Sequence, residues 1–142
     1  MKKTSLLLPA LALFTLLALN ACSNSNDDNL PNTDVTGQLT NSGDWKVSYY
    51  WDKDKEETNN FSGYSFLFKD NGVLEALKNG VTTTGTWQLN SSSNKLIIQI
   101  GTAKPLEDLT DDWLIVEKSN TVIKLKDDND THLEELHFSV IQ

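Results

Sequence analysis

The sequence predicts an all-β domain, an eight-stranded antiparallel up-and-down barrel with one or two short helices. Three observations lead to this fold class. From residue 45 onward, apolar side chains recur at every second position, which is the period of a half-buried β-strand. Turn sequences such as Asn71-Gly72 and Asn79-Gly80 separate these segments. No segment there has the dozen or more residues of helical periodicity that parallel strands need for their connections.

The size and charge of the chain restrict the functions open to it. Its 142 residues suffice for one domain, and 20 acidic residues outweigh 12 basic ones, all of them lysine, for a net charge of -8. A nucleic-acid-binding protein needs a basic surface. Phosphoryl-transfer sites commonly clamp phosphates with arginine. The composition therefore argues against nucleic-acid binding and gives no support to phosphoryl transfer.

The N-terminal residues have the pattern of an export signal. Lys2 and Lys3 form a charged start, and residues 6–19 are almost entirely apolar. As a helix this run would be about 21 Å long, at about 1.5 Å per residue. That is short of the roughly 30 Å hydrocarbon core of a bilayer, so we expect a cleaved signal and not a retained transmembrane helix.

The apolar run ends in Leu19-Asn20-Ala21-Cys22, and Cys22 is the only cysteine of the chain. This ending resembles the lipobox of bacterial lipoproteins. The resemblance implies a signal peptide over residues 1–21, cleavage after Ala21, and an outer-membrane protein anchored through lipidated Cys22 on the periplasmic or cell-surface face. An ordinary secretory signal with a chance cysteine is the alternative.

Residues 22–32 are polar and rich in Asn and Ser, which is typical of a flexible tether. The folded domain is then expected over residues 33–142. Near its start Val35 and Leu39 lie four residues apart, which predicts a short helix between Thr33 and Gly43, with Thr33 available as its N-cap.

The strands follow this helix in sequence. Trp45, Val47, Tyr49 and Trp51 alternate with mostly polar residues, so the first strand is predicted to place all four on one face. Seven more strands are predicted at about residues 64–68, 73–77, 81–89, 96–100, 113–118, 121–126 and 131–141. Glu134-Glu135 interrupts the alternation of the last strand, which predicts a β-bulge or an exposed edge there.

Eight sequential antiparallel strands can close into an up-and-down barrel, which leaves no open sheet edge. A sandwich of two four-stranded sheets is the alternative. Pro105, with Leu106 and Leu109 three residues apart behind it, predicts a helical turn in the connection between the fifth and sixth strands.

Short motifs add a resemblance to a known family. Gly43-Asp44-Trp45 is similar to the Gly-x-Trp signature of lipocalins, and Gly85-Thr86-Trp87 repeats the pattern. Together with Tyr64-Ser65-Phe66 before Asn71-Gly72, the order of motifs resembles the small lipocalin-like domains of bacterial outer-membrane lipoproteins. The resemblance covers about residues 43–142. It implies a lipocalin-like barrel in which Gly43 and Trp45 are structural residues at the closed end.

No combination of residues predicts catalysis, a metal site or a cofactor. The sequence contains neither Gly-x-Ser-x-Gly nor His-Glu-x-x-His. His132 and His137 are five residues apart on a predicted strand and so face opposite sides. Asp127, Asp128 and Asp130 lack the glycine and the distal glutamate of an EF-hand loop. We therefore expect a non-enzymatic protein with no metal.

In an up-and-down barrel the connections after the first, fifth and seventh strands meet at one end. The acidic residues and lysines of these connections are Asp52, Asp54, Glu56, Glu57, Glu107, Asp108, Asp111, Asp112, Asp127, Asp128, Asp130, Lys53, Lys55 and Lys104. Tyr49, Trp51 and Tyr64 are expected to approach this acidic end from inside, where their rings would bind a ligand. The negative field would favour neutral or cationic molecules.

Two functions follow from this description. The first is a lipid-anchored lipocalin-like protein that binds a small hydrophobic molecule, apolar, neutral or cationic, inside the barrel. The second is a non-enzymatic accessory or surface-interaction protein of the cell envelope, whose barrel is fully packed and whose loops contact a partner. The packing of the barrel interior distinguishes the two.

Overall fold

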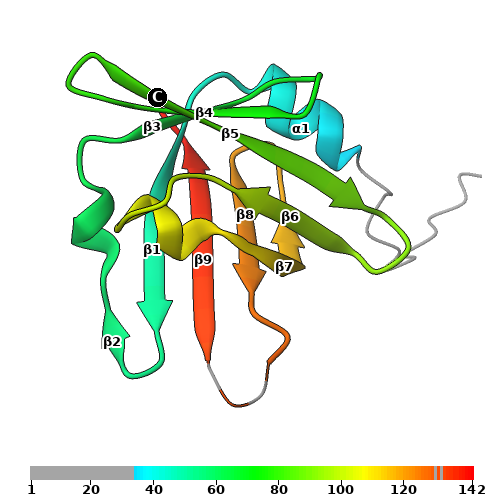
Figure 1. Ribbon diagram of the computed structural model, residues 1–142. Helices are drawn as coiled ribbons and strands as arrows, with labels where there is room; N and C mark the ends of the chain where they lie inside the picture. Colours follow the sequence, from blue (N-terminus) through cyan, green and yellow to red (C-terminus); the bar gives the residue numbers. More distant parts are fainter. Residues whose placement is uncertain (1–33, 130, 132) are drawn as a thin grey trace, which may run out of the picture. The chain divides into compact units, whose positions relative to one another are not determined.

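The computed structural model describes residues 34–129, 131 and 133–142 (Figure 1). The predicted signal peptide (1–21), the lipid-attachment residue Cys22, the tether (22–32) and the helix cap Thr33 lie outside the described residues. Asp130 and His132 do as well.

The predicted antiparallel barrel is confirmed, and each of the eight predicted strands is present. The strands are β1 (Trp45–Asp52), β3 (Ser65–Phe68), β4 (Val73–Lys78), β5 (Val81–Asn90), β6 (Lys95–Gln99), β7 (Asp111–Lys118), β8 (Val122–Lys126) and β9 (Glu134–Val140). Each pairs with its neighbour in sequence, and β1 pairs with β9 along its whole length. The pairing of first and last strands closes the sheet, so the alternative sandwich is wrong.

A further strand, β2 (Lys55–Glu56), forms a two-residue hairpin with the end of β1. The predicted short helix is α1 (Val35–Asn41), preceded by Asp34 at the N-cap position. The Asp34 side chain makes no capping hydrogen bond. Two 3-10 turns complete the fold, η1 (Thr58–Phe61) and η2 (Leu106–Leu109), and the second is the turn predicted behind Pro105.

Large side chains fill the barrel interior. Phe66, Leu74, Ile98 and Phe138 are completely buried, each from a different strand. Phe138 meets Phe66 edge to face, with ring centroids 5.4 Å apart. Burial of this kind supplies about 25 cal/mol for each Å² of apolar surface removed from water, so these contacts are the main source of stability.

Both ends of the barrel are covered. At one end Leu39 of α1 is completely buried, and Trp45 Nε1 donates a hydrogen bond to the Leu39 carbonyl at 3.1 Å. At the other end Leu109 of η2 is completely buried, and Trp113 Nε1 donates to its carbonyl at 3.0 Å. A tryptophan thus anchors each covering helical turn, and the interior is occupied by side chains from end to end.

The prediction that Trp45, Val47, Tyr49 and Trp51 share one face is wrong after Val47. The register with β9 shifts between Val47 and Tyr49, because β1 contains one extra residue there. A bulge of this kind moves every following side chain to the opposite face. Tyr50 therefore points inward and is 2% exposed.

The bulge predicted at Glu134-Glu135 is absent from that stretch, because β9 pairs regularly with β1 and β8 there. The irregularity lies in the partner strand β1, and β7 carries a second register shift between Ile115 and Glu117. The two adjacent glutamates instead mark the place where β9 begins at the acidic end.

Candidate binding surface at the acidic end

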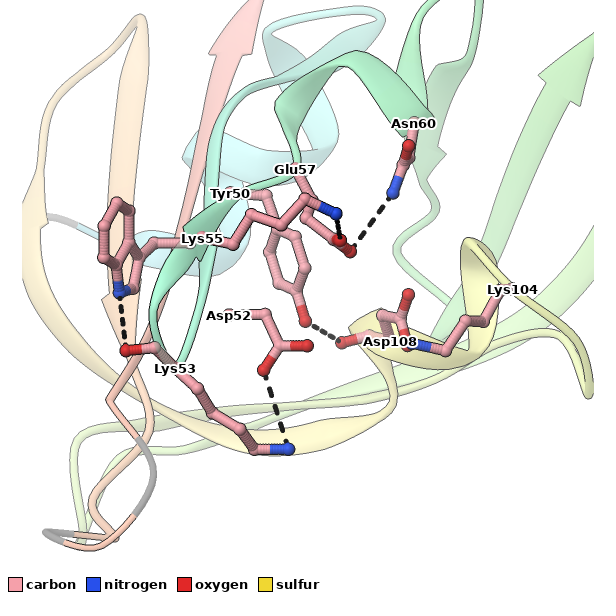
Figure 2. Close-up of polar contacts among 9 residues, drawn as sticks. Tyr50, Asp52, Lys53, Lys55, Glu57, Asn60, Lys104 and Asp108 are labelled. Carbon is pink, nitrogen blue, oxygen red and sulfur yellow. Dashed lines mark hydrogen bonds and ion pairs between the residues drawn. The ribbon is translucent and has the colours of Figure 1, made fainter.

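The acidic connections predicted for one end of the barrel lie there, and lysines pair with several of their carboxylates (Figure 2). Lys104 Nζ is 3.1 Å from Asp108 Oδ1, and Lys53 Nζ is 3.7 Å from Asp52 Oδ1. Lys55 contacts Glu57, which also accepts a hydrogen bond from Asn60 Nδ2.

A fourth lysine, which the connections themselves do not contain, comes from the barrel wall. Lys95 at the start of β6 forms ion pairs with both Asp112 and Asp128. This end is therefore less negatively charged than the sequence of the connections indicates.

Other carboxylates at this end repel one another. Asp52 and Glu134 are direct partners across β1 and β9, so their side chains lie on the same face. Partial burial, followed by repulsion from Asp52, raises the pKa of Glu134 to about 7. Partial burial also raises the pKa of Asp111 above its usual value. Near neutral pH the protonation state of Glu134 thus changes the charge of this end.

Tyr50 connects the carboxylates to the barrel core. Its hydroxyl donates a hydrogen bond to the Asp108 carbonyl at 3.3 Å (Figure 2). Its ring meets the Phe61 ring edge to face, with centroids 5.2 Å apart. Burial is the largest cause that raises the pKa of the Tyr50 hydroxyl, followed by Glu134 and then Asp108. Sequence analysis missed Tyr50, because the bulge that turns it inward leaves the alternation of β1 intact in the sequence.

Two of the three predicted ligand-binding residues come together on the outer wall of the barrel. The cross-strand partners of Tyr49 and Trp51 are His137 and Glu135, while the intervening Tyr50 faces the buried Leu136. Tyr49 and Trp51 therefore face outward, and their predicted approach from inside is wrong.

On this outer face they line a hollow of about 330 Å³. The remaining lining residues are Lys126, Asp127, Asn129, Leu133, Glu134 and Glu135. We call this hollow the aromatic groove. Leu133 is 68% exposed, which leaves apolar surface open to a ligand beside the two rings.

Neighbouring groups fix the two rings of the aromatic groove. Trp51 Nε1 donates to the Lys53 carbonyl at 3.2 Å, and the Tyr49 ring lies 4.9 Å from the His137 ring. Burial is the main cause that lowers the pKa of His137, which favours its neutral form at neutral pH. Of the acidic residues that line the groove, Glu135 is the cross-strand partner of Trp51 and shares its outer face, whereas Glu134 is the partner of Asp52 and faces the Tyr50 side. The groove thus offers flat apolar surfaces beside an outward-facing carboxylate, an arrangement that suits a cation with an apolar part.

Tyr64, the third predicted ligand-binding residue, lies elsewhere. It precedes β3, which pairs with β1 only at Trp45, and its ring stacks on Phe66 with centroids 6.0 Å apart. Lys78 Nζ lies 4.5 Å from the centre of the Tyr64 ring. Tyr64 lines two other hollows, of about 720 and 550 Å³, and takes no part in the aromatic groove.

Gly43 and Trp45 were predicted as structural residues at the closed end. Gly43 has φ +83°, a left-handed conformation that favours glycine, directly between α1 and β1. Trp45 is completely buried under α1. Neither residue is among those lining the aromatic groove.

In the described part of the chain, no three His, Cys, Asp or Glu side chains are arranged to hold a metal ion. Among residues 34–129, 131 and 133–142, no helix combines the length and the apolarity needed to cross a bilayer.

Neither a protein-family profile nor a curated protein matches the sequence at a significant level. Among solved structures, the chain is similar to a DUF4847 family protein from Bacteroides vulgatus ATCC 8482. The similarity has a TM-score of 0.52 and 14% sequence identity, and it covers 74% of this chain and 96% of the other. At this identity the match shows the fold alone: the chain shares its barrel architecture with that bacterial protein.

Proposed function

We propose that the chain is a non-enzymatic, lipid-anchored binding protein of the bacterial outer membrane, whose ligand is a cation with an apolar part. The lipid anchor is supported by the resemblance of residues 19–22 to a lipobox. Binding is supported by the aromatic groove, where Tyr49, Trp51 and Leu133 lie together and Glu135, the cross-strand partner of Trp51, shares their outer face. That juxtaposition is the observation on which the proposed function depends.

The ligand is placed on the outer wall because the barrel interior is full. Trp45, Trp113 and Phe138 are completely buried, and helical turns cover both ends. The aromatic groove, in contrast, is open and partly apolar. Cation–π contacts with Trp and Tyr contribute about 0.5–1 kcal/mol at exposed sites, so we expect weak binding that salt weakens further.

Three probes with the same alkyl chain test this function: hexyltrimethylammonium, hexanol and hexanesulfonate. Tryptophan fluorescence of the full chain carrying Cys22→Ser would report binding without an attached lipid. We expect the cation to bind at least about tenfold more tightly than the sulfonate at low salt. Equal affinity for cation and sulfonate would contradict the proposed charge selectivity.

Leu133→Ala and Val116→Ala form a matched pair of variants. Both residues are exposed, at 68% and 50%, and only Leu133 lines the groove. We expect Leu133→Ala to weaken binding of the cation and Val116→Ala to leave it unchanged.

A protein-partner function is the second candidate, and the packed interior favours it over a ligand inside the barrel. It predicts that none of the three probes binds. Binding of the cation at the aromatic groove would favour the small-molecule function.

A further inference from the structure

Strand β5 extends beyond the stretch over which it pairs with β6. Its ladder with β4 runs from Val81 to Thr86, whereas its ladder with β6 begins only at Thr86, opposite Gln99. Among the described residues, none pairs with the other edge of β5 between Val81 and Gly85. The β4–β5 hairpin projects beyond the neighbouring strand (Figure 1).

The polar groups on this free edge follow from the register. Trp87 N–H donates to the Gly72 carbonyl at 2.9 Å, toward the β4 side. Backbone groups alternate in direction along a strand, so those of Thr83 also face β4. The N–H and C=O groups of Thr82 and Thr84 therefore face the free edge. Four backbone hydrogen-bonding groups are presented there in the spacing of an extended chain.

The neighbouring strand does not close this gap, because β6 ends at Gln99 and its pairing with β5 ends there too. On the β7 side, Ile100 N–H donates to Thr110 Oγ1 at 2.9 Å, and the Thr110 hydroxyl donates to the Ile100 carbonyl at 3.1 Å. Gly101 then turns the chain away with φ +70°. The two strands diverge after Gln99 as a result, and a wedge-shaped space opens between β5 and the connection that follows β6.

This space is a hollow of about 720 Å³. Thr83 and Thr84 form one side, Thr102 and Ala103 belong to the opposite connection, and Tyr64 and Leu106 also line it. Several of the lining residues are small, among them Gly101, Thr102 and Ala103, and the volume is large enough to hold an extended backbone. A free edge with a wall opposite accepts a single extended chain more readily than the edge of a second sheet.

We propose that this hollow, the β5 edge groove, binds an extended segment of a partner polypeptide as an added β-strand. The segment would hydrogen-bond to Thr82 and Thr84 and place small or β-branched side chains between the two walls. This site is separate from the aromatic groove, with which it shares no lining residue, and does not depend on the proposed function.

Amide hydrogen exchange of the full chain carrying Cys22→Ser tests the edge first. In the free protein the amides of Thr82 and Thr84 should exchange fast, and the amide of Thr83 slowly. Equal protection of all three would overturn the assignment of a free edge. Protection of Thr82 and Thr84 that increases with protein concentration, together with a dimeric mass, would show a second copy on the edge and overturn the partner claim.

Heptapeptides selected from a random displayed library against the same protein then test binding. We expect selected peptides to slow exchange at Thr82 and Thr84 by about tenfold or more. Thr84→Pro removes one edge N–H without touching the β4 ladder and should weaken binding at least about tenfold. Thr84→Ala keeps the N–H and should bind as the wild type does.

Two results would overturn the proposal. One is a selection that yields no peptide protecting these amides. The other is a peptide that binds Thr84→Pro as tightly as Thr84→Ala, because strand addition requires that N–H group. Unfolding curves of both variants establish that they are folded when the peptide is added.

Discussion

The two ends of the barrel are closed by different chemistry. At the α1 end Leu39 is completely buried and Trp45 donates to its carbonyl. The buried polar side chain there is the neutral Gln38, which donates to Asn120 and whose Oε1 has no hydrogen-bond partner among the described residues. At the η2 end an equivalent pair, Leu109 and Trp113, lies beneath a layer of carboxylates. Asp108 Oδ2 in that layer is buried without a hydrogen-bond partner among the described residues.

The difference indicates where the molecule gives up stability. Burial of carboxylates near one another costs free energy unless cations or hydrogen bonds compensate it. Residues that reduce stability in this way commonly serve binding, because selection for stability alone would replace them. The proposed function accordingly assigns binding to the acidic end, with the aromatic groove beside it, and a structural role to the α1 end.

The largest expected effect tests the structural end. Trp45→Ala removes a completely buried ring, so we expect it to lower the free energy of unfolding by about 3–5 kcal/mol, measured by urea denaturation. Trp51→Ala at the functional end removes a partly exposed ring and should cost less than about 1 kcal/mol. Similar losses for the two variants would remove the contrast between the ends.

A smaller effect concerns pH at the acidic end. The pKa of Glu134 is raised to about 7, so the folded protein holds a proton that the unfolded chain loses near the ordinary pKa of 4.5. The stabilisation that Glu134 contributes is complete below 4.5, the pKa of the unfolded chain, and is lost as the pH rises through about 7. Because Glu134 is partly exposed to solvent, we expect the loss to be on the order of 1 kcal/mol.

Urea denaturation at about pH 5 and about pH 8 would measure this loss. Glu134→Gln should remove it, whereas Glu135→Gln, on the exposed neighbour, should retain it. His137 contributes with the opposite sign, since its pKa is lowered, and it is present in all three proteins. A wild-type profile unchanged by Glu134→Gln would mean that the carboxylates at this end do not destabilise the fold.

The smallest expected effect on stability comes from removal of the Tyr50 hydroxyl while its ring is retained. Tyr50→Phe keeps the contact with Phe61 and loses the hydrogen bond to the Asp108 carbonyl. We expect a loss of about 0.5–1.5 kcal/mol in the free energy of unfolding, typical of one hydrogen bond. No loss at all would indicate that the buried leucines of η2 and the hydrogen bond from Trp113 hold it without the Tyr50 hydroxyl.

Much of the fold could be predicted from the sequence, because strand alternation and turns such as Asn79-Gly80 are local signals. The stretch from Trp45 to Trp51 shows why the proposed binding surface could not be predicted from the sequence. The alternation of that stretch is regular, and the bulge after Val47 exists only in the pairing of β1 with β9. Tyr49 and Trp51 were thus predicted to bind a ligand from inside the barrel, whereas the structure places them on its outer face.

Leu133 shows a signal that sequence analysis could have used. It is a single leucine after a run of polar residues that begins at Asp127, where a packing role is not expected. The acidic groups near it were predicted from topology alone. The ion pairs of Asp112 and Asp128 with Lys95 could not be predicted, because that lysine comes from a strand and approaches them only when β6, β7 and β8 pair in this register.

The central claim is that ligands bind to the outer wall of a packed barrel, and methyl NMR spectra with hexyltrimethylammonium test it most directly. The probe should shift the methyl signals of exposed Leu133 and leave those of the completely buried Leu74 and Ile98 unchanged. The opposite pattern, with the buried methyl signals shifting and Leu133 unaffected, would place the ligand inside the barrel and contradict the account.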